Sequence, residues 1–238
     1  MKWRGLDEKQ NVDAGTTLAA RLDERRVLME KYVSAETQAL NRRAVEELQA
    51  SGIEARVLPV GGVAPGFELP DQDGKIVGYA LTSANIGQMW GTALSGPLII
   101  LFFRGRWCPF DVAQLEAWNE LLPIAGVSVI GISPQTQHQS YLMHEQHKLK
   151  FPLLSDAGNK VARQFGLVYR VPAYQQEIYS RTFVNLPFIN GNDSWELPVP
   201  ATYGIDREGR VVLAAANADY TRRVEPATAI MAVVPGAY

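Results

Sequence analysis

The order of apolar stretches along the chain predicts alternating strands and helices from about residue 98 onward. Residues 98–103 form a continuous apolar run, which is typical of a strand buried on both faces. After it we expect a helix near 110–122, a strand at 127–132, a helix near 137–149 and a strand at 151–154. A short helix should follow, capped by Asp156 and ending at Gly166. Two final strands, 201–206 and 211–215, flank a turn and predict a β-hairpin. This alternation indicates an α/β sandwich with a mixed sheet.

The first 57 residues predict a helical extension of different texture from the rest. Residues 14–58 are charged, rich in Ala, Leu, Glu and Arg, and free of proline. Ser34 is placed to cap a helix, and Gly52 lies where a C-terminal glycine is common. Both expected helices carry thin apolar stripes. We therefore expect them to pack on the main body or on a second subunit.

Two glycine- and proline-rich segments divide the remainder of the chain. The stretch Gly61–Gly66 marks the boundary region between the helical extension and a main domain, to which we assign residues 58–238. A short strand is expected directly after this stretch, at 67–69. Residues 168–199 interrupt the strand–helix rhythm with a plausible helix near 172–183 and a loop. An insertion of this length either serves function or covers a sheet edge.

Composition narrows the class of protein. Of 238 residues, 47% are hydrophobic and 20% charged, enough for a sizeable core, and the net charge of −2 gives no strong attraction to nucleic acid or anionic membranes. The single cysteine cannot form an internal disulfide, the N-terminus lacks the apolar core of a signal peptide, and no run approaches a membrane span. We expect a soluble cytoplasmic protein without nucleic-acid or membrane partners.

That single cysteine stands where candidate chemistry gathers. Cys108 follows the apolar strand after a short turn, and Pro109 suits the first turn of a helix. A helix N-terminus stabilises a thiolate, as Arg104 and Arg106 also would. Asp111 would raise the pKa unless an arginine neutralises it, and we expect the arginine and dipole effects to prevail if either arginine faces the sulfur. The alternative is a small buried hydrophobic residue.

Ordered motifs resemble the peroxiredoxin-like branch of the alkyl hydroperoxide reductase/thiol-specific antioxidant family, over roughly residues 58–228. The segment FFRGRWCPF at 102–110 resembles the branch's active-site run F-[FY]-R-G-x-W-C-P-[YF]. Further matches are GVAPGFEL at 62–69, ISP at 132–134, LSD at 154–156, WELPVPATY at 195–203 and DREG at 206–209. The resemblance implies a thioredoxin-like three-layer α/β/α sandwich with a central mixed sheet.

The chain departs from the family pattern in two respects. Typical members carry P-x-x-x-T-x-x-C, whereas Leu101 and Gly105 occupy the Pro and Thr positions here, and the usual catalytic arginine before the late strand is not evident. Arg104, Arg106 or the Arg222-Arg223 pair could substitute for it. Relatives with Cys-Pro-x-Cys have a second cysteine where this chain has Asp111. No resolving cysteine therefore exists in this sequence.

The resemblance also assigns a substrate pocket. Its expected members are Gly105, Trp107, Pro109, Phe110, Asp111, Val199 and Pro200. Pro200 matches the cis-proline of the thioredoxin fold, and a cis bond would bring the Val199 carbonyl beside the sulfur. The alternative is an ordinary trans proline that opens an edge strand.

The resemblance implies a one-cysteine-type thiol peroxidase that reduces hydrogen peroxide or organic hydroperoxides through a Cys108 sulfenic acid, with Arg104 and Arg106 as catalytic partners. An external thiol or thioredoxin-like protein would recycle it, and we expect a homodimer. The competing hypothesis is a non-catalytic or redox-sensing thioredoxin-fold binding module. His138, His144 and His147 share one predicted helix but lack a third ligand, so we expect no metal and no cofactor.

Overall fold

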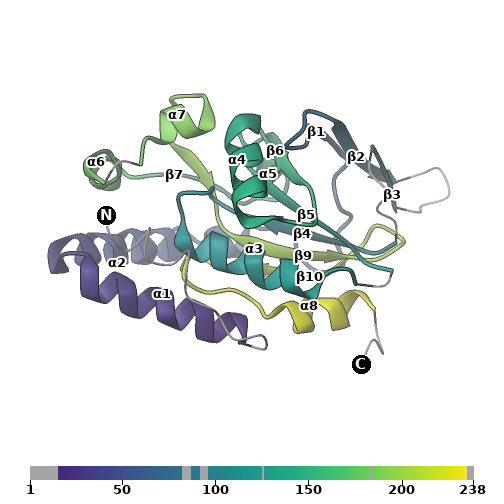
Figure 1. The fold of residues 1–238 in the computed structure, drawn as a ribbon, viewed down its shortest axis with the longest axis horizontal. Coiled ribbons are helices and arrows are strands. Elements are labelled where there is room, and N and C mark those ends of the chain that lie inside the picture. Colours follow the sequence, from purple (N-terminus) through teal and green to yellow (C-terminus); the bar gives the residue numbers. More distant parts are fainter. Residues whose placement is uncertain (1–15, 82–86, 92–95, 125, 183, 235–238) are drawn as a thin grey trace.

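A five-stranded mixed sheet forms the centre of the molecule (Figure 1). The computed structural model describes residues 16–81, 87–91, 96–124, 126–182 and 184–234. The sheet has the order β10-β9-β4-β5-β6 and comprises β4 (Leu98–Phe102), β5 (Ser128–Ser133), β6 (Leu153–Ser155), β9 (Ala201–Ile205) and β10 (Val211–Ala216). Strands β4, β5 and β6 run parallel, whereas β9 is antiparallel to both β4 and β10. The predicted mixed sheet and closing hairpin are confirmed.

Three helices cover one face of this sheet. They are α3 (Pro109–Leu121), α4 (Gln137–His147) and α8 (Pro226–Val233). Because side chains alternate along a strand, Ile99 and Leu101 of β4 point to this side and pack with Trp118 of α3. Every residue of β4 is buried, as its continuous apolar run predicts.

The opposite face carries the third layer. Alternate β4 residues, such as Ile100 and Phe102, pack there against Phe165 after α5 (Lys160–Gln164) and Ile53 of the short helix η3 (Ile53–Ala55). A three-stranded antiparallel sheet of β1 (Phe67–Pro70), β2 (Ile76–Leu81) and β3 (Gly87–Trp90) joins this layer. The fold is therefore the expected thioredoxin-like sandwich, with a small extra sheet that the sequence did not predict beyond β1.

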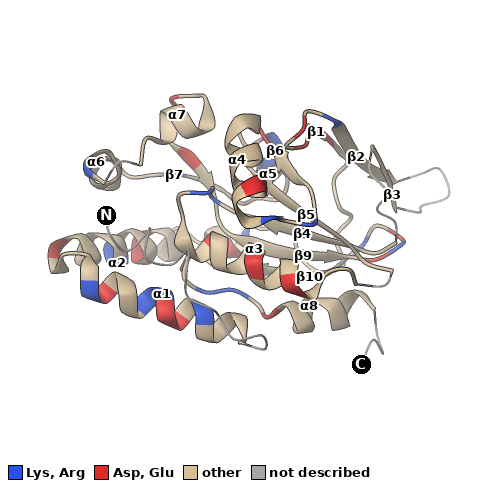
Figure 2. Ribbon diagram, viewed as in Figure 1, with Lys and Arg blue, Asp and Glu red and all other residues tan. Residues whose placement is uncertain are grey.

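Two helices precede the sandwich and lie beside one another at the lower left of Figure 1. They are α1 (Leu18–Tyr32) and α2 (Ala35–Ala50), and together we call them the N-terminal hairpin. The predicted ends of α2 are confirmed, since the Ser34 hydroxyl accepts from the Thr37 amide and Gly52 adopts φ 68°. Figure 2 shows charges of both signs along α1 and α2, consistent with their thin apolar stripes.

The hairpin packs on the main body of its own chain. Leu18 and Leu22 of α1 are buried against α3, and α2 contacts α6 (Ala173–Arg181) of the insertion. Among the described helices, none is both long and apolar enough to cross a membrane.

The insertion at 168–199 is closed at its base by a two-stranded antiparallel sheet. Strands β7 (Val168–Arg170) and β8 (Glu196–Pro198) pair there, and α6 and α7 (Leu186–Asn190) lie between them. The sequence predicted α6 but not the β7–β8 pairing. This base holds α6 over the start of α3, which brings the insertion to the site described next.

Candidate active site

Cys108 lies where the sequence predicts it, between the end of β4 and the start of α3. It is the N-cap residue of α3, and Pro109 occupies the first helical turn. The Cys108 carbonyl accepts from the Val112 amide, which closes the first turn of the helix. The Cys108 side chain is 0% exposed. The thiol is therefore held at a helix N-terminus but sealed from solvent.

Arg104 supplies the one polar side-chain contact described for the sulfur. Its Nη2 donates to Cys108 Sγ at 3.0 Å, and Arg104 is itself only 3% exposed. The guanidinium carbon lies 4.0 Å from the Tyr220 ring centroid and 4.8 Å from that of Trp107. Two aromatic faces therefore hold the cation against the sulfur. The Arg104 Nε atom is buried without a hydrogen-bond acceptor.

Burial dominates the pKa of the Cys108 thiol. Desolvation raises this pKa above its usual value, while the Arg104 charge and hydrogen bond and the Arg223 charge lower it. The Asp111 carboxylate adds a smaller increase. We expected the arginine and dipole effects to lower the thiol pKa overall, and with the sulfur fully buried this expectation is wrong. Removing water from around a thiolate destabilises it by more than one adjacent guanidinium stabilises it.

Asp111 is a structural anchor beneath the site. Its Oδ2 accepts from the backbone amides of Arg104 at 2.8 Å and Gly105 at 3.3 Å, and its Oδ1 accepts from Arg223 Nη2 at 2.6 Å. The Asp111 and Arg223 side chains are 0% and 2% exposed. Arg223 also donates to Gln114 of α3. Arg223 thus neutralises the carboxylate that would otherwise oppose a thiolate.

The backbone at Gly105 explains why no threonine stands there. Gly105 has φ 145°, a conformation that residues with a side chain rarely adopt. A Cβ at this position would also lie 2.9 Å from Trp107 Nε1. The turn therefore presents the Arg104 and Gly105 amides to Asp111, and no hydroxyl faces the sulfur from position 105.

Two expected members of the site lie differently. Arg106 does not reach the sulfur, because its guanidinium donates to Gln139 and Gln146 of α4. The Val199–Pro200 bond is trans, so the expected cis-proline is wrong. The Val199 amide donates to the Leu167 carbonyl and the Pro200 carbonyl accepts from Asn217, which keeps the chain extended as it enters β9. Val199 and Pro200 still lie beside the end of β4, because the next residue, Ala201, pairs with Phe102.

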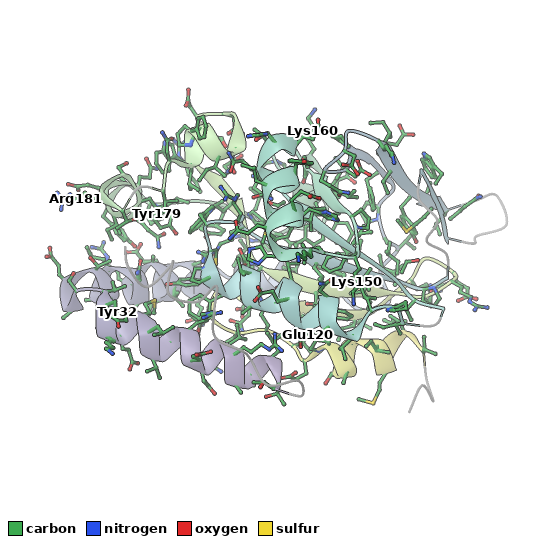
Figure 3. All side chains as sticks on the ribbon, in the orientation of Figure 1. Tyr32, Glu120, Lys150, Lys160, Tyr179 and Arg181 are labelled. Carbon is green, nitrogen blue, oxygen red and sulfur yellow. The ribbon has the colours of Figure 1, made fainter. Side chains whose placement is uncertain are left out.

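An aromatic shell surrounds the Arg104 guanidinium, and of its members the sequence predicted Trp107 and Phe110 for the pocket. Tyr179 of α6 packs on Trp107 with ring centroids 5.2 Å apart, and Figure 3 labels it on that helix. Tyr220 packs on Phe110 with ring centroids 5.7 Å apart. Burial raises the pKa of Tyr220 to about 12. For Tyr179 the only sequence signal was the tyrosine content of the insertion.

A narrow cavity of about 60 Å³ reaches this shell from the surface. Trp107, Pro109 and Phe110 line it, as the sequence predicts for a pocket, together with Arg104. Met29 and Val33 from the N-terminal hairpin and Tyr179 from α6 form its outer walls. Within the described ranges, no group of three His, Cys, Asp or Glu side chains is arranged to hold a metal ion.

Comparison with protein families identifies the lineage of this site. A model described as the AhpC/TSA family matches residues 60–214, more than half of the chain. The chain belongs to the AhpC/TSA family. The match begins before β1 and ends within β10, so it includes Cys108 and Arg104 but stops before Tyr220 and Arg223. The N-terminal hairpin also lies outside it.

Individual AhpC/TSA relatives carry peroxiredoxin names. The chain is 32% identical over 114 residues to peroxiredoxin Bcp of Escherichia coli K12, covering 46% of this chain and 65% of that protein. It is 31% identical over 121 residues to chloroplastic peroxiredoxin Q of Triticum aestivum, covering 50% of this chain and 51% of that protein. The chain thus spans about half to two thirds of the length of these relatives.

Solved structures share the AhpC/TSA fold. Peroxidoxin BcpB of Mycobacterium tuberculosis superposes with a TM-score of 0.52 at 20% identity, covering 74% of this chain and 96% of that one. A peroxiredoxin-like protein from Aquifex aeolicus gives 0.53 at 16% identity, covering 74% and 86%. At these identities the likeness concerns the fold, and it supports the thioredoxin-like architecture.

Proposed function

We propose that this protein is a one-cysteine-type thiol peroxidase that reduces hydrogen peroxide or organic hydroperoxides at Cys108. The observation that carries the proposal is the buried contact of 3.0 Å between Arg104 Nη2 and the Cys108 sulfur at the start of α3. A cation and a helix N-terminus both favour the thiolate once water or substrate reaches the sulfur. Membership in the AhpC/TSA family supports the same chemistry.

The proposed reaction starts with attack of the Cys108 thiolate on the terminal peroxide oxygen. A sulfur–oxygen bond forms and the oxygen–oxygen bond breaks, which oxidises the cysteine to sulfenic acid and releases an alkoxide or hydroxide that takes up a proton. Arg104 Nε is buried without an acceptor, and in this proposal it donates to a peroxide oxygen as negative charge develops there. Since Cys108 is fully buried, the site has to open locally before peroxide can reach the sulfur.

Recycling in this proposal uses an external thiol or a thioredoxin-like reductant. The sequence has one cysteine, so an internal disulfide cannot form. A first thiol displaces water from the sulfenic acid to give a mixed disulfide, and a second thiol releases Cys108 and leaves as the disulfide of the reductant. Asp111, which pairs with Arg223, stands at the position where relatives with Cys-Pro-x-Cys carry the second cysteine.

The decisive test is peroxide consumption with dithiothreitol as reductant. Wild-type protein should consume hydrogen peroxide and form Cys108 sulfenic acid detectable by mass spectrometry. Cys108→Ser should lose the activity while keeping its fold, because serine is a poor nucleophile of nearly the same size. Equal consumption rates for the two proteins would refute the proposal.

A second candidate function is a redox-sensing or non-catalytic thioredoxin-fold binding module. The complete burial of the sulfur and the raised pKa of the thiol favour it. The rate of Cys108 alkylation as a function of pH separates the two. A thiol pKa below about 7 in solution would favour the peroxidase, whereas a value near or above the free value of about 8.5 would favour the module.

We further propose that the protein acts in the cytoplasm, without nucleic-acid or membrane partners, and as a homodimer. A single unpaired cysteine suits a reducing compartment. Val27 and Tyr32 leave exposed apolar surface on α1 that a second copy could cover. Sedimentation equilibrium over a range of concentrations tests the dimer, and a monomer throughout would overturn it.

A further inference from the structure

The N-terminal hairpin covers the cysteine with residues outside the family match. Leu18 and Leu22 of α1 belong to the same buried apolar cluster as Cys108 and Phe110. On the other side, α2 is tied to the insertion, because Tyr174 of α6 donates to Glu47 at 2.7 Å. The hairpin and α6 therefore form a wall around the start of α3, and the hairpin side of this wall lies outside the family match.

The opening left in this wall is small. The cavity volume of about 60 Å³ has room for only a few water molecules. Arg104 lines this cavity and Cys108 does not, while Arg104 Nη2 contacts the sulfur and its buried Nε has no acceptor. A molecule entering this way meets the guanidinium first and then the thiol.

The walls of the cavity are mostly apolar and aromatic, with Thr37, Asn41 and Thr182 as neutral polar members. Of the residues that line it, Arg104 is the only charged one. Met29 and Val33 stand on the hairpin side, and Ile178 and Tyr179 stand on the α6 side. An uncharged molecule crosses such a wall more easily than an ion, because burying a charge costs far more than burying a small neutral group.

Met29 is the residue best placed to control the width. It lies on α1, is half-buried, and its sulfur is 3.9 Å from the Tyr220 hydroxyl, so it spans from the hairpin to the shell around Arg104. Trp107 and Tyr220 instead hold the guanidinium itself. Methionine is unbranched and flexible, so replacing it changes the opening without removing the cation's partners.

We propose that the N-terminal hairpin makes the Cys108 site selective for small uncharged molecules, with Met29 as the specificity-determining residue. This inference rests on the proposed peroxidase function and deepens it. The favoured substrates are hydrogen peroxide and short alkyl hydroperoxides, and the favoured reductants are small thiols, two of which convert the sulfenic acid to thiol, water and one external disulfide. Bulky hydroperoxides and protein reductants are excluded while the wall is closed.

Thiol labelling tests the filter without requiring any peroxidase activity. Cys108 in the full-length protein is reacted with N-methylmaleimide and with N-pyrenylmaleimide, which share a reactive group but differ in size. Each rate is divided by the rate for the urea-unfolded chain. The normalised rate for N-pyrenylmaleimide, divided by the normalised rate for N-methylmaleimide, gives a bulky-to-small ratio. This ratio should lie at least about tenfold below unity in wild type, in line with the discrimination that hydrophobic pockets achieve. It should rise several-fold in Met29→Ala.

Val27→Ala is the matched control, since Val27 lies on the same helix but is exposed and does not line the cavity. Met29→Phe provides a second variant that should slow even the small reagent. Circular dichroism checks that each variant is folded. A wild-type ratio near unity, or an equal rise in Met29→Ala and Val27→Ala, would overturn the inference.

A peroxide assay separates failure of the filter from failure of the proposed function. Hydrogen peroxide should be consumed faster than cumene hydroperoxide by wild type, and Met29→Ala should narrow that difference. If wild type and Met29→Ala consume both peroxides with the same preference, the filter is refuted while the peroxidase stands. If neither peroxide is consumed although labelling is size-dependent, the peroxidase is refuted and the filter over Cys108 stands.

Discussion

At the scale of single residues, the Cys108 sulfur lies under two opposing influences. Burial favours the neutral thiol, and the Arg104 guanidinium at 3.0 Å favours the thiolate. Local opening would hydrate the sulfur and remove much of the first influence while leaving the second. Arg104 therefore matters most in the open, reactive form, and its removal provides the sharpest test of this balance.

Replacing Arg104 with methionine should move the pH midpoint of Cys108 alkylation to higher pH. The Arg104 charge and hydrogen bond lower the thiol pKa, so their loss leaves the thiolate less stable and the thiol protonated to higher pH. The measurement is the iodoacetamide reaction rate from pH 6 to 11. Arg104→Lys should restore part of the shift. Arg106→Met is the control, because Arg106 contacts Gln139 and Gln146 instead. Equal midpoints in Arg104→Met and wild type would contradict this account.

The buried Asp111–Arg223 pair should be costly to break from one side. Asp111→Asn leaves a buried guanidinium without its carboxylate and weakens the acceptor for the Arg104 and Gly105 amides. We expect a loss of about 3–5 kcal/mol in the free energy of unfolding, measured by urea titration. The double variant Asp111→Asn/Arg223→Met should be more stable than Asp111→Asn alone. Strict additivity of the two single changes would show that the pair does not interact.

At the scale of elements, α1 is held to the sandwich by a few separate contacts. Its first amides, at Leu18 and Ala19, donate to the Glu225 carboxylate just before α8, and Arg21 forms an ion pair with Glu120 of α3. The first turn of α1 has no acidic residue of its own, so Glu225 supplies the negative charge that a helix N-terminus favours. The position of the wall over Cys108 therefore depends on a residue more than 200 positions away.

Glu225→Gln should loosen α1 and speed labelling of Cys108. An amide oxygen accepts more weakly than a carboxylate and carries no charge, so we expect a loss of about 0.5–1 kcal/mol in the free energy of unfolding. The labelling rate with N-methylmaleimide should rise by more than this global loss accounts for, because the change acts on the wall itself. Asp23→Asn on the exposed face of α1 is the control. Labelling that rises equally in both variants would argue against a role for Glu225.

The elements also show which sequence signals were sufficient. The apolar run of β4, the Cys-Pro step and the Ser34 cap each predict structure locally, and each is confirmed. Strands β7 and β8 were not predicted, because their three-residue pairing joins segments on either side of the whole insertion. Short pairings between distant segments leave almost no local pattern.

At the scale of the whole molecule, the site combines distant parts of the chain. The strand–turn–helix around Cys108 was predictable, because its residues are consecutive in sequence. The Met29 and Tyr179 walls and the Tyr220–Arg223 segment come from the hairpin, the insertion and the chain after β10. Their approach to Arg104 follows from tertiary packing, which periodicity does not encode. The rise in the Cys108 pKa that burial causes likewise could not be predicted from the sequence, because the burial depends on how the hairpin and α6 pack over the cysteine.

The layers of the molecule should differ in stability, with the hairpin opening before the sheet. Every residue of β4 and β5 is buried, whereas α2 has a single buried residue and the buried face of α1 includes Arg21 and Arg25. A contact surface containing charged groups buries less apolar area and separates at lower cost. In native-state hydrogen exchange, peptides from α1 and α2 should therefore exchange through local opening, and peptides from β4 only through global unfolding.

This gradient connects the architecture to the chemistry, because the opening seen by exchange should be the route that admits reagents too bulky for the cavity to Cys108. At saturating N-pyrenylmaleimide the labelling rate should level off at the opening rate measured for α1 peptides under conditions where each opening leads to exchange. Glu225→Gln should raise both rates by the same factor and leave β4 exchange governed by global stability. If α1 exchanges as slowly as β4 while Cys108 still reacts readily with N-pyrenylmaleimide, bulky reagents reach the sulfur by another route and the hairpin does not control access.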